Sequence, residues 1–321
     1  MCRKATSEDA PAGVYLKARV RELAMANLEQ TLSGWTGPSS NSEQEKQDRT
    51  ERMIREAIAE HSALSGVRLR VFAKGSYANN TNVRTDSDVD IAVQCTEAEY
   101  WEEAQPGLRP SNTGGVYGGK WTPSLLRSEL TAALIAKFGT AAVDTSNSTA
   151  IFVKSSSARV DADVVPCFSF RRYMPGGDDR LGTMIFKQSG ERIINYPDQQ
   201  LKEGRAKNTS TGNAYKKSVR ILKRLENVLV AESRYKELAS YFVECLAYNC
   251  PEPAFAHSTW TETVKAMLIA IWNNTQGDEP ADESLRWLEV NRCFFLFHPK
   301  QKWTRADAQG FAQAAWTYLR F

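Results

Sequence analysis

Two aspartates separated by a single residue constrain the fold and function of this chain more than any other feature of its sequence. They lie in the segment Ser87-Asp88-Val89-Asp90-Ile91-Ala92-Val93. Because successive side chains of a strand point to opposite faces, Asp88 and Asp90 would share one face while the apolar residues enter a core. Two neighbouring carboxylates repel each other unless a cation lies between them. Carboxylate oxygens and substrate phosphates are the ligands that Mg²⁺ prefers, so the segment predicts a magnesium-dependent site.

Two further motifs support this interpretation. A strand expected over 67–74 ends at Gly75-Ser76, where backbone amides and a hydroxyl can approach phosphates. A later strand, expected over 158–170, carries Asp161 and Asp163 on one face. Three carboxylates on adjacent strands can hold two metal ions about 3.5–4 Å apart. A lone Asp-x-Asp pair is common by chance, so the prediction depends on the three motifs together.

The remaining pattern indicates the fold class. Apolar residues at helical spacing predict helices over 14–32, 42–61, 124–138, 215–230, 238–248, 259–272 and 305–319. Alternation predicts strands over 67–74, 89–93, 149–154 and 158–170, and the basic stretch 202–217 is expected to be a loop. This order predicts an α+β fold, with a small mixed sheet and its helices in residues 1–196 and a helical domain in residues 197–321. A cleft between two such parts is a favoured ligand site.

Composition excludes several classes of protein. The 321 residues carry 41 Lys and Arg against 38 Asp and Glu, so a net charge of +3 provides no global basic field for nucleic acid. Apolar runs are far shorter than the roughly 18 residues of a membrane-spanning helix. The six cysteines form no CxxC pair, and the three histidines do not lie near one. We therefore expect a cytoplasmic protein with reduced thiols and without a structural zinc site.

These motifs resemble those of a known superfamily. The run GSYANNTNVRTDSDVDIAV, residues 75–93, resembles the GS-x(n)-SDxD signature of the DNA polymerase β-like nucleotidyltransferases. ADVVPCF at 162–168 is similar to the third-acid strand of the branch that contains oligoadenylate synthase and cGAS. Tyr215–Lys223 and Ser240–Val243 resemble the helical half of that branch. The chain is thus similar to bacterial cGAS/DncV-like nucleotidyltransferases (CD-NTases), which implies a polymerase β-like core packed on a helical domain.

The resemblance also implies an activity, the synthesis of cyclic di- or trinucleotide second messengers from NTPs. The setting would be bacterial anti-phage (CBASS) signalling, with a separate effector protein that binds the product. By resemblance, Asp88, Asp90 and Asp163 are the catalytic acids and hold two Mg²⁺ ions, which Mn²⁺ can replace. The family pattern places the third acid directly before two apolar residues and a proline, which favours Asp163. Asp161 stays open as the alternative ligand.

Nucleotide-binding residues are implied as well. Gly75 and Ser76 would contact phosphates, and Lys223 would hold the donor triphosphate. Arg220 lies three residues from Lys223 and so shares its helix face. Ser240 would assist them and Tyr241 would stack on a base. Two alternatives stay open: Arg220 and Lys223 could be a solvated helix face, and Tyr241 could be a core aromatic.

Rival functions also fit the scaffold. One is a non-cyclising nucleotidyltransferase that tails RNA or modifies a protein or small molecule, and another is a catalytically silent nucleotide sensor. Three intact acids argue against the sensor, because a carboxylate cluster is costly to keep. No zinc-ligand cluster and no long basic run are visible, so a nucleic-acid activator is not expected. The choice of bases, the ring size and the 2′–5′ or 3′–5′ linkage are not determined by the spacing of motifs.

Overall fold

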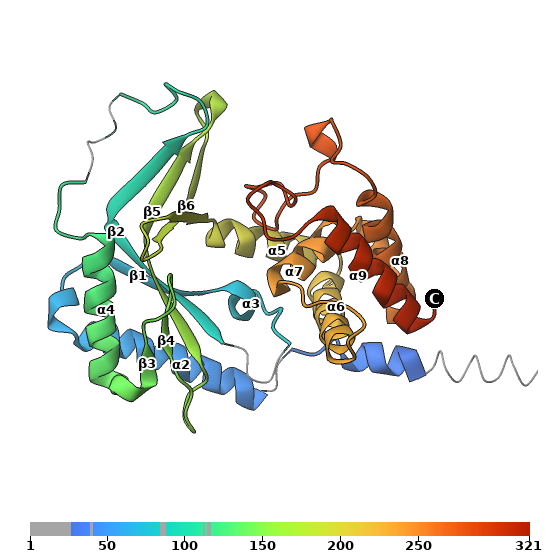
Figure 1. Cartoon of the computed structure of the whole chain (residues 1–321), viewed down its shortest axis with the longest axis horizontal. Coiled ribbons are helices and arrows are strands. Elements are labelled where there is room, and N and C mark those ends of the chain that lie inside the picture. The colour runs from blue at the N-terminus through green and yellow to red at the C-terminus, as the bar shows by residue number, and fades with distance from the viewer. Residues whose placement is uncertain (1–26, 39–40, 84–87, 112, 114–116) are drawn as a thin grey trace, which may run out of the picture.

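The computed structural model describes residues 27–321 except 39–40, 84–87, 112 and 114–116. Residues 14–26 of the first predicted helix and Ser87 of the acidic segment lie outside this part of the chain, while residues 27–34 are helical. Figure 1 shows a twisted sheet with its helices on one side and a bundle of helices on the other. The predicted α+β class is confirmed. Among the described residues, no helix is both long and apolar enough to cross a membrane.

A mixed sheet organises the first half of the chain. Its strands are β1 (Leu69–Lys74), β2 (Val89–Glu103), β3 (Val143–Asp144), β4 (Ile151–Val153), β5 (Ala162–Tyr173), β6 (Asp179–Phe186) and β7 (Arg192–Asn195). The order is β1-β2-β5-β4-β3, and β6 pairs with both β5 and β7. β2 and β5 run parallel to each other, and the other pairs are antiparallel. The acidic strand β2 therefore lies inside the sheet, between the edge strand β1 and the central strand β5.

The sequence prediction was wrong about the extent of two regions of the sheet. β2 continues ten residues beyond the expected end at Val93, and its register against β5 shifts between Cys95 and Glu99. Such a bulge interrupts the two-residue alternation from which strands are recognised. β6 and β7 were not expected, since they form the outer, partly exposed edge of the sheet.

Two helices cover one face of the sheet (Figure 1). They are α2 (Asn41–Glu60) and α4 (Pro123–Phe138), which contact each other as well as β2 and β5. Thr122 caps the start of α4 by accepting a hydrogen bond from the Leu125 amide. The shared core includes Val89 and Ile91 of β2, both fully buried. The apolar residues that flank Asp90 thus enter the core as the alternation predicted.

The helical half contains α5 (Pro197–Ser210), α6 (Ala214–Ala231), α7 (Ser240–Asn249), α8 (Trp260–Asn274) and α9 (Arg305–Leu319). The expectation of a loop from residue 202 was wrong, because α5 extends to Ser210. The segment is too polar to show helical periodicity in its sequence. Its contacts with α6 and β6 stabilise the helix instead. The helix 27–34 also belongs here, since Glu29 accepts hydrogen bonds from the Trp260 and Thr261 amides at the start of α8.

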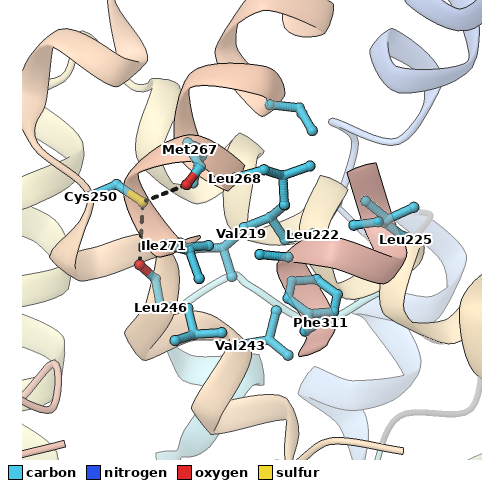
Figure 2. Packing of buried hydrophobic residues seen from close by; sticks show 14 of the residues in the cluster. Val219, Leu222, Leu225, Val243, Leu246, Cys250, Met267, Leu268, Ile271 and Phe311 are labelled. Atoms are coloured by element: carbon cyan, nitrogen blue, oxygen red, sulfur yellow. Dashed lines mark hydrogen bonds between the residues drawn. The ribbon is translucent and has the colours of Figure 1, made fainter. Parts of the chain in front are cut away.

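Figure 2 shows the core of this half, where apolar residues of α6, α7, α8 and α9 interdigitate. Val219, Leu222, Met267, Ile271 and Phe311 are fully buried. Cys250 is a free thiol here, and its Sγ–H group contacts the carbonyl oxygens of Leu246 and Met267. This core fixes α6 and α7 relative to the other helices, and both helices contribute side chains to the site.

Candidate active site

A cavity of about 280 Å³ lies between the sheet and the helical half. Its wall includes Lys74, Gly75 and Ser76 at the end of β1, together with Asp90 of β2. From the helical half come Lys223 of α6 and residues of α7. Six residues predicted from the sequence line this cavity: Gly75, Ser76, Asp90, Lys223, Ser240 and Tyr241. Motifs far apart in the sequence therefore meet at one hollow.

The acidic residues are set by strand register. Asp90 is paired with Lys74 on one side and with Asp163 on the other, so Asp163 stands directly beside Asp90 on the neighbouring strand. Lys74 Nζ lies 3.4 Å from Asp90 Oδ1. Asp88 is exposed and lies immediately before β2. Burial raises the pKa of Asp163, the charges of Asp90 and Asp88 raise it further, and Lys74 opposes them.

Asp161 has a different environment from Asp163. Its Oδ1 accepts a hydrogen bond from the Ser155 backbone amide, and it lies on the wall of a separate surface hollow. β5 begins at Ala162, so the strand alternation that would place Asp161 and Asp163 on one face does not extend to Asp161. The geometry therefore favours Asp163 as the third acid.

The side chains do not form a finished metal site. Within the described part of the chain, no three Asp, Glu, His or Cys side chains converge as a metal-binding group. The donor chemistry still fits a hard cation, because Asp90 and Asp163 offer only oxygen ligands on adjacent strands. The binding of magnesium by these acids stays a prediction.

Gly75 is needed because it has no side chain as well as because its backbone can adopt a positive φ. Its φ of 70° lies in the left-handed region, and a Cβ added there would be 2.5 Å from Asp90 Oδ2. The turn that follows is closed by hydrogen bonds from the Asn79 amide to the Gly75 carbonyl and from the Thr81 amide to the Ser76 carbonyl. The Gly-Ser turn is thus packed directly against the Asp90 carboxylate.

We expect Gly75→Ala to reduce activity at least tenfold, because a methyl group would displace Asp90 in addition to straining the backbone by about 1–2 kcal/mol. The matched control is Gly66→Ala. Gly66 has a similar φ of 75°, but nothing lies within 4 Å of its Cβ position. Thermal unfolding should show similar losses of stability for the two variants, and turnover should fall only for Gly75→Ala. Equal turnover in both variants would contradict the assigned role of Gly75.

Lys223 and Tyr241 lie on the helical wall of the cavity. Lys223 Nζ is 3.3 Å from Glu244 Oε2 and 3.4 Å from Thr81 Oγ1, and burial lowers the pKa of Lys223. Tyr241 contacts Glu289 and Asn291 through its hydroxyl, and its ring meets the edge of Trp303. Tyr241 therefore both lines the cavity and packs in the core, which the sequence left as alternatives.

Arg220 does not lie on the cavity wall. Its guanidinium donates hydrogen bonds to the carbonyl oxygens of Thr36, at 2.7 Å, and Asn80, at 2.5 Å. The geometry does not support the predicted contact of Arg220 with nucleotide. The i, i+3 spacing correctly places Arg220 and Lys223 near one face of the helix. It cannot show that the Arg220 guanidinium is hydrogen-bonded to backbone carbonyls.

Some cavity residues were missed by sequence reasoning. Lys74 directly precedes the Gly-Ser pair, and Glu244 lies four residues after Ser240 on one face of α7. Both could therefore have been predicted as site residues from their spacing to the motifs. Glu289 and Asn291 also line the cavity, and burial raises the pKa of Glu289. They lie between α8 and α9 in a segment without helical or strand periodicity, which left no pattern to find them.

Comparison with known proteins places the chain in a family. Residues 202–320 match the family model of the cGAS/DncV-like nucleotidyltransferase C-terminal helical domain. The cyclic dipyrimidine nucleotide synthase CdnE of Legionella pneumophila is 37% identical over 299 residues, which cover 91% of this chain and 98% of that protein. The enzyme of the same description from Cecembia lonarensis is 34% identical over 296 residues, with the same coverage of both chains. The chain belongs to the cGAS/DncV-like nucleotidyltransferases.

A solved structure of another CD-NTase confirms the fold across both halves. It is the CdnE cyclic dinucleotide synthase of Elizabethkingia meningoseptica with GTP and Apcpp, at a TM-score of 0.76 and 31% identity. The alignment covers 91% of this chain and 99% of that one. The resemblance drawn from the Gly-Ser and aspartate motifs is therefore correct, as is the class of enzyme that it implied.

Proposed function

We propose that this CD-NTase makes a cyclic dinucleotide from two NTPs. One observation carries the proposal: Asp90, which stands in register with Asp163 of the neighbouring strand, lines a cavity together with Gly75, Ser76 and Lys223. This arrangement places a predicted catalytic acid and the predicted phosphate-binding groups around one hollow. The activities named for its relatives in Legionella pneumophila and Cecembia lonarensis support the cyclic product.

We further propose that Asp88, Asp90 and Asp163 hold Mg²⁺, with two ions expected and Mn²⁺ as a substitute. The charges around the cavity support a need for added cations. Lys74 and Lys223 face the carboxylates of Asp90, Glu244 and Glu289, so the described wall is acidic before a triphosphate enters. When bound, magnesium neutralises the phosphates and lowers the pKa of the attacking hydroxyl.

The protein's own groups would then act mainly by positioning. The donor triphosphate lies against Gly75, Ser76 and Lys223, with Ser240 beside it and its base against Tyr241. A ribose hydroxyl of the acceptor, oriented on the Asp163 side, attacks the α-phosphorus in line. One oxygen–phosphorus bond forms as the bond to pyrophosphate breaks, and the hydroxyl proton leaves to solvent. The linear product then turns over, and a second attack of the same kind closes the ring.

The decisive experiment is incubation of the purified protein with all four NTPs and Mg²⁺, followed by phosphatase and mass spectrometry. We expect a phosphatase-resistant cyclic dinucleotide that disappears with excess EDTA and in an Asp88→Ala, Asp90→Ala double variant. Its mass identifies the bases, and linkage-specific nucleases identify the ring bonds. Linear tails would instead indicate a non-cyclising nucleotidyltransferase. Bound NTP without any product would indicate a nucleotide sensor.

The biological setting follows from the family resemblance. We propose a cytoplasmic enzyme of bacterial anti-phage (CBASS) signalling whose product binds a separate effector protein. The same assay tests the expected independence from nucleic acid, because added DNA or RNA should leave the rate unchanged.

A further inference from the structure

Glu244 is a buried carboxylate that joins four segments at the wall of the cavity. It lies on α7, and its side chain is 1% exposed. Glu244 Oε1 accepts hydrogen bonds from Asn79 Nδ2 at 2.5 Å and Gln200 Nε2 at 3.5 Å. Glu244 Oε2 accepts from Thr81 Oγ1 at 2.7 Å and Lys223 Nζ at 3.3 Å. A carboxylate this deep is costly unless such donors surround it.

The partners of Glu244 are the residues that shape the phosphate-binding turn. Asn79 and Thr81 donate their backbone amides to the carbonyls of Gly75 and Ser76, while their side chains reach Glu244. Between them, Asn80 has a φ of 53°, and its carbonyl accepts the hydrogen bond from Arg220. Charged side chains of the helical half therefore hold all three residues that follow the turn: Glu244 holds Asn79 and Thr81, and Arg220 holds Asn80.

The contact leaves little space for movement. Gly204 of α5 packs on the side chain of Asn79, and a Cβ added to Gly204 would lie 2.9 Å from Asn79 Oδ1. Lys223 is 3% exposed, and its ammonium group reaches both the turn, at Thr81, and Glu244. The position of the predicted triphosphate-binding lysine is thus coupled to the position of the Gly-Ser turn through one carboxylate.

We infer that Glu244 is a positioning residue that fixes the Gly75–Ser76 turn and Lys223 relative to each other, so that both contact the same triphosphate. This inference rests on the proposed function, because it concerns the binding of an NTP at this cavity. Glu244 acts through Lys223, Asn79 and Thr81. Its effect should therefore fall on the phosphates of the substrate and leave the nucleoside part unaffected.

The test is Glu244→Gln, which keeps the size of the side chain but replaces one acceptor oxygen by an NH₂ group that cannot accept. Either the donors at Oε1, Asn79 and Gln200, or those at Oε2, Thr81 and Lys223, then lose their acceptor. Isothermal titration with Mg²⁺ compares a non-hydrolysable NTP analogue with the corresponding nucleoside monophosphate. Loss of a charge-assisted hydrogen bond should weaken NTP binding about tenfold or more. Monophosphate binding should change less than about twofold, since that ligand lacks the phosphates that Lys223 would contact.

The matched control is Glu226→Gln. Glu226 is another buried carboxylate of the helical half, which accepts from the Leu238 amide and does not line the cavity. It should lose thermal stability like Glu244→Gln but keep its affinity for the NTP analogue. In steady-state assays, KM should rise more than kcat falls for Glu244→Gln. Equal losses of NTP and monophosphate affinity, or no loss, would overturn the inference.

A second variant keeps the test usable if Glu244→Gln does not fold. Thr81→Val removes the hydroxyl that donates to Glu244 and accepts from Lys223, and it leaves the Glu244–Lys223 pair intact. It should therefore weaken NTP binding about threefold without changing monophosphate binding. Unchanged NTP affinity in Thr81→Val would contradict the inference. If the wild-type protein binds NTP but forms no product, the proposed function fails, while these binding comparisons still test Glu244.

Discussion

Asp90→Asn should lower product formation at least about a thousandfold while the protein stays folded. Asp90 faces the cavity, stands beside Asp163 and is packed against Gly75, so asparagine fits the same space. The amide lacks the negative charge that a divalent cation requires. Initial rates of cyclic product at saturating NTP and Mg²⁺ provide the measurement.

The control for this substitution is Asp198→Asn. Asp198 forms an exposed ion pair with Arg70 at 2.6 Å and does not line the cavity. Exposed pairs of this kind contribute about 0–1 kcal/mol to stability, so activity and thermal unfolding should both stay close to wild type. Wild-type turnover in Asp90→Asn would overturn the assignment of the active site.

Asp163→Asn should abolish activity to a similar extent and, in the absence of divalent cations, stabilise the protein at neutral pH. Burial and the charges of Asp90 and Asp88 raise the pKa of Asp163 above its ordinary value. The folded state therefore binds this proton more tightly than the unfolded state, and ionisation of Asp163 costs stability as the pH rises through its raised pKa. Asparagine removes that cost, because it carries no charge at any pH.

The measurement is thermal unfolding in EDTA across the acidic to neutral range. The advantage of Asp163→Asn over wild type should be largest at neutral pH and should shrink as the pH falls below the pKa of Asp163. Asp161→Asn is the matched variant, since it changes the neighbouring acid but keeps an oxygen that can accept from the Ser155 amide. It should retain activity within about threefold. Loss of activity in Asp161→Asn with retention in Asp163→Asn would reverse the assignment of the third acid.

Local patterns predicted the parts of the site that lie on one short segment. The position of Asp90, the Gly-Ser turn and the entry of Val89 and Ile91 into the core all follow from strand alternation and turn chemistry, and the structure shows each of them. The pairing of Asp90 with Asp163 is a matter of register between strands more than seventy positions apart. The motifs suggested that the two acidic strands are neighbours, but the choice of Asp163 over Asp161 rested on the resemblance.

Other features depend on contacts that no local pattern contains. Arg220 and Lys223 occupy one face of α6, but the first contacts backbone carbonyls and the second faces the cavity. Glu289 enters the cavity from an irregular segment between α8 and α9, where no periodic pattern marks it. The long β2 was underestimated for a related reason, because its bulge changes which side chains face the core.

The path of the chain limits how the two halves can move. The helix 27–34 packs on the helical bundle and the next helix, α2, packs on the sheet, so the chain crosses there and crosses back between β7 and α5. Arg224 fixes the first crossing by donating to the carbonyls of Trp35 and Gly37. Arg220 and Glu244 add contacts with residues 79–81, so the two halves are joined at more points than the two crossings and the opposing walls of the cavity keep their alignment.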